Sequence, residues 1–203
     1  MRREIDTVIY DIGGVLTIDE EKNFYRIRGY SEEMTERLYR ATMKSGHWEE
    51  FDLGNLSTEE VIDLFVKTDP EIEKEIRDSL SDISELVKKS DAAIPWIRKV
   101  KAAGKKALVL SNFSEFSREQ CADALTFLPE TDGGILSCEH HVIKPMPKIY
   151  LKLMEMYDLV PERCVFIDDN QPNLDAAEAL GIHTILYRSQ EQAEKELDEM
   201  LGI

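Results

Sequence analysis

The chain contains 203 residues, of which 42% are apolar and 33% charged, a composition typical of globular proteins and unlike that of disordered, fibrous or membrane-embedded chains. This length suffices for one packed domain of ordinary size, or for a core domain with a modest insertion. The formal net charge is −16, and no segment concentrates lysine and arginine. A surface that wraps a polyanion is therefore excluded, and we expect no nucleic acid among its partners.

The cysteines and the hydropathy of the sequence indicate in which cellular compartment the protein is expected. The three cysteines, Cys121, Cys138 and Cys164, fit neither a disulfide framework nor paired zinc ligands, which predicts buried thiols. No run approaches the roughly 18 apolar residues of a membrane helix, and the segment that starts Met1–Glu4 lacks a signal-peptide pattern. We therefore expect a cytoplasmic protein without a membrane partner.

Short apolar runs that end at polar residues predict the strands. The clearest are residues 7–10 before Asp11, residues 107–110 before Ser111, and residues 165–167 before Asp168 and Asp169. Because their hydrophobicity is continuous and does not alternate, we expect a parallel sheet that helices cover on both faces. Two further strands are predicted at residues 135–138 and 184–187.

Helical patterns separate these strands. One begins at Pro95, a residue suited to the first turn of a helix, and stops at Gly104. Another, over residues 147–157, places large side chains along one stripe. The alternation of strand and helix predicts a doubly wound α/β fold.

Residues 17–93 interrupt this alternation. They carry helical periodicity and no convincing strand, and their many glutamates are typical of solvated helix faces. We therefore predict two domains, which are an α/β core formed by residues 1–16 and 94–203 and an inserted helical domain formed by residues 17–93.

The polar residues that end the strands are expected to meet at one site. Ligands of open α/β sheets bind beyond the carboxyl ends of the strands, although Ser111 alone would be read more readily as a turn residue or helix N-cap. Carboxylates such as Asp11, Asp168 and Asp169 repel each other at one edge unless a cation joins them. Oxygen ligands of this kind suit Mg²⁺ paired with a substrate phosphate.

Four segments, in this order, resemble the motifs of the haloacid dehalogenase (HAD) superfamily. They are residues 8–16 (VIYDIGGVL), residues 108–112 (LVLSN), residues 143–145 (IKP) and residues 165–170 (VFIDDN). Each motif alone is moderately specific, but together they span the core. The resemblance implies a doubly wound parallel-sheet, Rossmann-like α/β core with an inserted α-helical cap domain, residues 17–93, that covers the site and selects substrates.

The resemblance also implies the chemistry. Asp11 is the expected nucleophile, which attacks phosphorus and becomes an aspartyl phosphate that water then hydrolyses. Lys144, Ser111 and Asn112 are expected to bind the phosphoryl oxygens and neutralise their charge. The implied function is a phosphatase that acts on a small phosphorylated metabolite, by analogy a sugar phosphate.

The expected cofactor is Mg²⁺. By resemblance it is held by Asp11, the carbonyl oxygen of Gly13, and Asp169, with Asp168 bound directly or through water. The acidic pair at positions 168 and 169 favours phosphate chemistry, because dehalogenases that resemble this core usually lack it and need no magnesium.

Gly13 departs from the common phosphatase pattern, which has a second aspartate at this position as general acid and base. General acid–base catalysis typically contributes about 10²- to 10⁴-fold, so we expect aryl or anomeric phosphates to react faster than alkyl monoesters. Family branches that resemble sugar-phosphate phosphatases also carry glycine there. Water, a cap residue or the substrate remain as alternative proton donors.

Two other functions stay open. One is a dehalogenase, in which Asp11 displaces halide from carbon, and the other is a regulatory protein that binds a phosphorylated ligand without turning it over. Sensitivity to a chelator separates the first from a phosphatase, and binding without product identifies the second. The sequence leaves open the substrate and the choice between monomer and homodimer.

Histidines are not assigned to the site. His140 and His141 are neighbours whose side chains point in opposite directions on an extended chain, so both would rarely serve one site. His47 and Trp48 lie in the predicted cap, where packing of the aromatic residue is the favoured interpretation over substrate contact.

Overall fold

The computed structural model describes residues 4–21 and 23–203. Residues 1–3 and residue 22 lie outside the described residues. The start of the predicted core domain and most of the segment Met1–Glu4, tested above for a signal-peptide pattern, therefore fall outside them.

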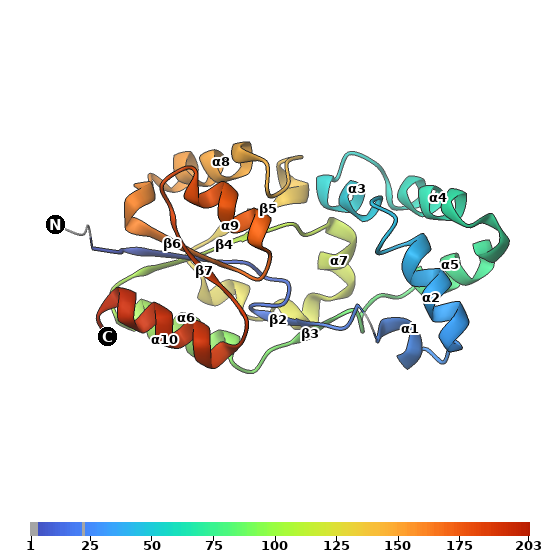
Figure 1. The fold of residues 1–203 in the computed structure, drawn as a ribbon, viewed down its shortest axis with the longest axis horizontal. Coiled ribbons are helices and arrows are strands. Elements are labelled where there is room, and N and C mark those ends of the chain that lie inside the picture. Colours follow the sequence, from blue (N-terminus) through green and yellow to red (C-terminus); the bar gives the residue numbers. More distant parts are fainter. Residues whose placement is uncertain (1–3, 22) are drawn as a thin grey trace.

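A parallel sheet forms the centre of the core, with five strands in the order β5-β4-β1-β6-β7 (Figure 1). The strands are β1 (Thr7–Tyr10), β4 (Lys106–Ser111), β5 (Gly134–Leu136), β6 (Cys164–Asp168) and β7 (His183–Leu186). All four neighbouring pairs are parallel. The predicted strands are confirmed within one residue at each end, except that β5 ends at Leu136 and a 3₁₀ helix, Ser137–Glu139, follows.

Helices cover both faces of this sheet, which explains why its central strands are continuously apolar. On one face lie α8 (Pro147–Tyr157) and α9 (Gln171–Glu178), and on the other lie α6 (Ala93–Ala102) and α10 (Gln190–Leu201) (Figure 1). Ile9 points into the first layer, and its neighbours Val8 and Tyr10 point into the second. The predicted doubly wound α/β core is confirmed.

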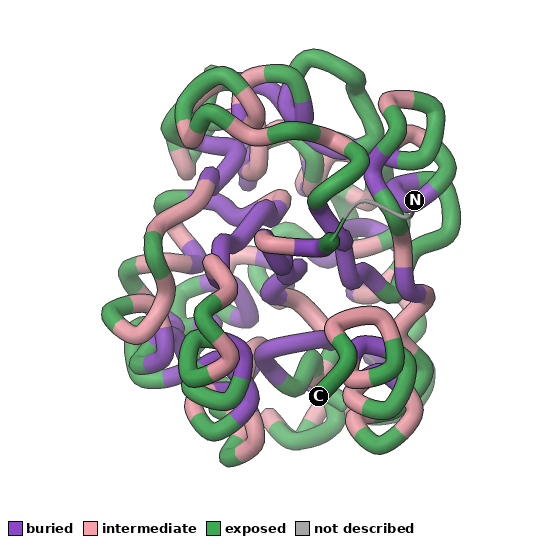
Figure 2. The backbone as a smooth tube through the Cα atoms, turned by 90° about the vertical axis from the view of Figure 1, so that its left-hand side faces the viewer, coloured by how far each residue is buried: buried purple, intermediate pink, exposed green. Residues whose placement is uncertain are grey.

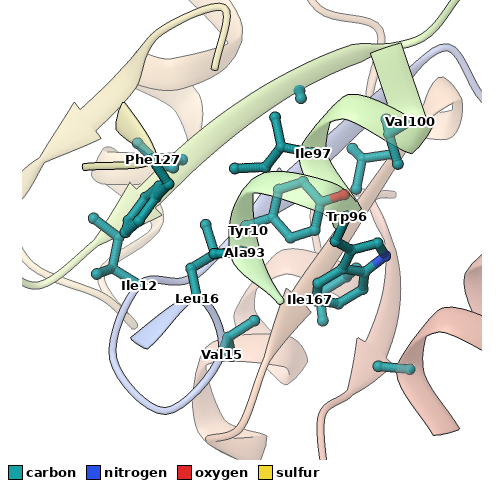
Figure 3. Packing of buried hydrophobic residues seen from close by; sticks show 14 of the residues in the cluster. Tyr10, Ile12, Val15, Leu16, Ala93, Trp96, Ile97, Val100, Phe127 and Ile167 are labelled. Atoms are coloured by element: carbon teal, nitrogen blue, oxygen red, sulfur yellow. The ribbon is translucent and has the colours of Figure 1, made fainter. Parts of the chain in front are cut away.

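The layer that contains α6 brings two large aromatic side chains into contact. Tyr10 of β1 packs edge-on against Trp96 of α6, with ring centroids 4.9 Å apart, and Ile97 fills the space beside them (Figure 3). Trp96 is 1% exposed and Ile97 is fully buried. Figure 2 shows that such buried segments run through the interior beneath exposed turns of helix.

The chain between β1 and α6 is mainly helical. It contains α1 (Phe24–Ile27), α2 (Glu32–Ala41), α3 (Trp48–Leu53), α4 (Thr58–Thr68), a 3₁₀ helix (Pro70–Ile72) and α5 (Glu73–Leu80). Leu38, Phe65 and Ile76 pack in a hydrophobic cluster separate from the two layers beside the sheet, as an inserted helical unit requires. This arrangement agrees with the α-helical insertion expected from the sequence.

The prediction of no strands in residues 17–93 is wrong. The strands β2 (Thr17–Asp19) and β3 (Val87–Lys89) form an antiparallel pair where the chain enters and leaves the helical segment. Each has three residues, and in β2 Ile18 is 52% exposed. Because neither strand forms a buried apolar run, the criterion that identified the core strands did not detect this pair.

The remaining elements connect the core. They are α7 (Glu115–Gln120) and 3₁₀ helices at Ala122–Leu125, Leu128–Glu130 and Pro161–Arg163. Cys121, Cys138 and Cys164 are buried and form no disulfide, as predicted. Within the described residues, no helix combines the length and apolar character needed to cross a membrane.

We predict that Ile97→Ala lowers the free energy of unfolding by about 2–5 kcal/mol, because the side chain is fully buried and leaves a cavity. The matched control is Leu151→Ala on α8, whose side chain is 52% exposed and whose loss should change stability by no more than about 0.5 kcal/mol. Urea unfolding measures both, and equal losses would contradict this packing.

Candidate active site

The carboxyl ends of the central strands bring the predicted residues together. Tyr10 pairs in register with Val109 of β4 and with Ile167 of β6, so the residues that follow emerge at one edge of the sheet. Asp11 continues this order, because its backbone N–H donates to the Ile167 carbonyl oxygen at 2.9 Å.

Lys144 lies between two of these carboxylates. Its Nζ is 2.8 Å from Asp11 Oδ1 and 2.7 Å from Asp168 Oδ2. All three residues are buried, with exposed fractions of 3% for Lys144, 7% for Asp11 and 0% for Asp168. The predicted nucleophile and the predicted phosphate-binding lysine therefore form a buried ion pair.

Asp168 is held by three groups. Asn170 donates its backbone N–H to Oδ1 at 2.8 Å, Asn173 donates its side-chain amide to the carboxylate at 3.1 Å, and Lys144 contacts Oδ2. Asn173 sits in the first turns of α9, and the hydroxyl of Tyr150 donates to its carbonyl oxygen. The direction of the Asp168 carboxylate is thus fixed by helices of the core.

Burial and the neighbouring charges shift the pKa values of Asp11 and Lys144. Burial raises the pKa of Asp11, and the nearby Asp168 raises it further, whereas Lys144 and a hydrogen bond from Ser111 lower it. Burial alone would lower the pKa of Lys144, but the carboxylates of Asp11 and Asp168 raise it above its ordinary value. Lys144 is therefore held in its charged form.

The motif at residues 108–112 contributes two side chains with different contacts. Ser111, at the end of β4, is 1% exposed, and its side chain lies close enough to Asp11 to lower the pKa of that carboxyl group. The side chain of Asn112 instead holds the backbone of Lys144. Its Oδ1 accepts from the Lys144 N–H at 2.7 Å, and its Nδ2 donates to the Lys144 carbonyl oxygen at 3.0 Å. Asn112 thereby fixes the lysine loop against β4.

The carboxylates are arranged so that they could hold a metal ion. One oxygen from each of Asp11, Asp168 and Asp169 lies within 4.8 Å of the others. Lys144 offsets one of the three negative charges, and the all-oxygen donor set suits a hard divalent cation such as Mg²⁺. These residues therefore fit the cofactor that the sequence predicts.

The turn after β1 approaches this cluster closely. Gly14 has a φ of +67°, and a Cβ at this position would lie 2.8 Å from Asp169 Oδ2, so the conformation and the contact both require glycine. Gly13 lies beside it on the wall of a cavity. Burial raises the pKa of Asp169, and the charge of Asp168 raises it further.

Two hollows open at this edge of the sheet. One, of about 580 Å³, is lined by Gly14, Asp169 and Tyr187 together with residues of β2. The other, of about 140 Å³, lies between Gly13 and Asn112 of the core and Met43, Trp48 and Asp52 of the helical segment. Hollows at the switch point of an α/β sheet are the expected place for a ligand.

The sequence interpretation missed three polar residues here. Asn173 positions Asp168, Asp19 lines both hollows, and Asp52 lines the smaller one. A signal for Asn173 existed, since it follows closely after the motif VFIDDN at residues 165–170. Asp19 and Asp52 stand among many acidic residues of the helical segment, and their sequence context does not distinguish them.

The histidines and aromatic residues have other partners. His141 Nδ1 lies 2.9 Å from the Leu53 carbonyl oxygen at the end of α3. Trp48 packs against Phe51 and Phe65, with ring centroids 5.3 and 5.9 Å apart. The packing interpretation of Trp48 is confirmed, although one side of its ring also lines the smaller hollow.

Two curated proteins illustrate the relationships of this chain. Acyl-CoA dehydrogenase family member 10 of Mus musculus is 29% identical over 98% of this chain, which spans only 19% of that protein's length. Phosphorylated carbohydrates phosphatase of Thermotoga maritima is 26% identical over 89% of this chain and 84% of its own length.

Solved structures share the fold. A HAD family enzyme from Bacteroides thetaiotaomicron, in complex with magnesium and inorganic phosphate, is 19% identical and covers 92% of this chain and 96% of its own, with a TM-score of 0.69. The L-2-haloacid dehalogenase of Xanthobacter autotrophicus is 18% identical and covers 96% of this chain and 83% of its own, with a TM-score of 0.62. The haloacid dehalogenase-like hydrolase family matches residues 5–181, and the chain belongs to this family of hydrolases.

Proposed function

We propose that this hydrolase is a magnesium-dependent phosphatase that acts on a small phosphorylated metabolite through an aspartyl phosphate on Asp11. The observation that carries the proposal is the cluster of three carboxylates around one buried lysine at the edge of the sheet. Asp11 Oδ1 contacts Lys144 and the Ile12 N–H, and we propose Oδ2 as the oxygen that attacks phosphorus.

The residues around Asp11 have different proposed roles, which follow from their charges. Lys144 neutralises the phosphoryl oxygens while it holds Asp11 in place, and Ser111 and the backbone at Asn112 offer further donors, which is most of what phosphoryl transfer requires. Asp11, Asp169 and the carbonyl oxygen of Gly13 would hold Mg²⁺. Bound there, the ion would neutralise charge on the substrate phosphate.

Asp168 has a different proposed part. Its oxygens already accept from Asn170, Asn173 and Lys144, so contact with the ion through water fits its surroundings better than direct binding. The contact through water would make Asp168 part of the metal site. Its main effect would be to orient Lys144.

We further propose that residues 17–93 are a cap domain and that residues 1–16 and 94–203 are the core. Three residues of the helical segment, Met43, Trp48 and Asp52, face Gly13 and Asn112 across the smaller hollow, which supports a role of this segment in selecting the substrate. The carbohydrate phosphatase relative supports a sugar phosphate as the first class to test.

A dehalogenase is the second candidate, because a haloacid dehalogenase shares the fold. That reaction also uses an aspartate at the end of the first strand as nucleophile, but it needs no metal. A reaction without a metal does not need the carboxylates of Asp168 and Asp169 beside Asp11, so we favour the phosphatase.

We predict that the protein hydrolyses an aryl phosphate with Mg²⁺, and that excess chelator abolishes the turnover. Asp11→Asn removes the nucleophile and should lower kcat at least about 10³-fold. Asp123→Asn, which changes an exposed carboxylate, is the control and should keep full activity. Release of inorganic phosphate measures all four conditions. Turnover that persists with chelator, or in Asp11→Asn, would contradict the proposal, and halide release without metal would favour the dehalogenase.

We also predict that Lys144→Met lowers the free energy of unfolding by about 3–5 kcal/mol, because two buried carboxylates lose their cation. Burial raises the folded-state pKa of Asp11, so lowering the pH through that pKa protonates the folded protein preferentially and should recover stability. Added Mg²⁺ should also recover part of it. Urea unfolding with and without Mg²⁺ is the measurement, and Lys148→Met, on an exposed lysine, is the control. A deficit equal to that of the control, or one that Mg²⁺ leaves unchanged, would be inconsistent with this charge balance.

A further inference from the structure

The leaving group of the proposed reaction has no proton donor on the nucleophile loop, because position 13 is glycine. A phosphoryl transfer places the leaving oxygen roughly opposite the attacking one. Since Asp11 is at the floor of the site on the edge of the sheet, the leaving oxygen points away from the sheet, toward the helical segment that covers this edge.

The part of the helical segment that lies at this edge is α3. It lies beside α7 of the core, near the carboxyl ends of the strands (Figure 1). One of its residues, Asp52, faces the smaller hollow that Gly13 and Asn112 line from the opposite side. Asp52 is therefore a carboxyl group on the side where the leaving group departs.

The core anchors α3 at the position of Asp52. Ser137 donates its hydroxyl to the Asp52 carbonyl oxygen at 2.6 Å, and the same hydroxyl accepts from the Phe113 N–H at 3.0 Å. At the next turn, Gly54 packs so closely that a Cβ would lie 2.9 Å from the Cys138 carbonyl oxygen. The backbone of Asp52 is thus fixed over the site although it belongs to the helical segment.

The side chain of Asp52 is half-buried and, among residues 4–21 and 23–203, its carboxyl group has no hydrogen-bond or ion-pair partner. Burial raises its pKa to about 8, with Glu49, Asp11 and Glu21 raising it as well and Lys144 opposing them. A carboxyl group in this environment is protonated at neutral pH, as a general acid must be.

Asp19 is the competing candidate. A Cβ at Gly13 would lie 3.0 Å from Asp19 Oδ2, so this carboxylate is next to the place of the missing side chain. The backbone of Gly14 and the hydroxyl of Thr17 both hydrogen-bond to Asp19, and these donors favour its ionised form. Burial raises its pKa to about 6, below the value of about 8 for Asp52, so at neutral pH a smaller fraction of Asp19 carries a proton.

We propose that Asp52 is the general acid and base of this site, which supplies the proton that position 13 cannot. The assignment rests on the proposed phosphatase function. As the bond between phosphorus and the leaving oxygen breaks and the bond to Asp11 forms, the Asp52 carboxyl proton passes to the leaving oxygen, and the alcohol departs.

The second step, hydrolysis of the aspartyl phosphate, returns Asp52 to its protonated form. Ionised Asp52 takes a proton from the attacking water, whose oxygen bonds to phosphorus while the bond from phosphorus to Asp11 breaks. Inorganic phosphate leaves, and Asp52 is again protonated and Asp11 again ionised. Water is the only co-reactant, and both carboxyl groups end the cycle as they began it.

The test compares Asp52→Asn with wild type on an alkyl and an aryl phosphate in the presence of Mg²⁺. An alkyl leaving group needs the proton and an aryl one does not. We therefore expect kcat/KM, which reports the steps up to departure of the leaving group, to fall about 10²- to 10⁴-fold for the alkyl ester and by less than about tenfold for the aryl ester. Loss of the base in the second step lowers kcat for both esters and does not affect this comparison. In wild type, alkyl turnover should decline as the pH rises through about 8, and the variant should lose this dependence. Thermal unfolding of the variant should be unchanged, because the carboxyl group has no partner to lose.

Asp19→Asn is the matched comparison, since it removes the other carboxylate beside Gly13. If Asp52→Asn lowers kcat/KM equally for both substrates, or if Asp19→Asn produces the selective loss of kcat/KM for the alkyl ester, the assignment of Asp52 is overturned while the phosphatase stands. If wild type releases no phosphate from either substrate, the phosphatase proposal fails first and the assignment fails with it. The two failures are therefore distinguishable.

Discussion

The contact on which the site depends is the buried ammonium of Lys144 between Asp11 and Asp168. A buried ion pair contributes little net stability compared with well-packed apolar groups, so its main consequence is chemical. It fixes Asp11, the proposed nucleophile, and brings a positive charge to the place where a phosphoryl group would bind. The surrounding structure maintains it, because Asn112 holds the lysine backbone, and Asn170 and Asn173 hold Asp168. The strands contribute through their register, which brings Asp11 and Asp168 to the same edge.

The helical segment completes the site from the other side. Its anchoring to the core by Ser137 and by the close packing of Gly54 places the carboxyl group of Asp52 over the hollow that Gly13 and Asn112 line from the core side. The net charge of −16 opposes the approach of an anion, so the proposed capture of a phosphate would depend on Lys144 and on a cation held among the carboxylates. Burial is the main cause that raises the pKa of Asp52, and the acidic residues Glu49, Asp11 and Glu21 raise it further.

Much of the core could be predicted from the sequence because its signals are local. Continuous apolar runs identified the central strands, and the residues that end them identified Asp11, Ser111 and Asp168 before any geometry was known. The pair formed by β2 and β3 was missed because short, exposed strands carry no such run. The amide of Asn112 was assigned to phosphate, whereas its contacts with the Lys144 backbone depend on the loop geometry. Asp52 could not be distinguished from other glutamates and aspartates, because its position comes from tertiary anchoring of α3 to the core.

The most direct test of this account is a single turnover of an aryl phosphate with Mg²⁺, quenched in acid and followed by peptide mass spectrometry. The account predicts a transient phosphoryl group on Asp11, in the peptide that contains β1, which is absent with chelator and in Asp11→Asn. Hydrolysis of the substrate with no phosphorylated peptide at any time, or with the phosphoryl group on another residue, would contradict the central role of Asp11.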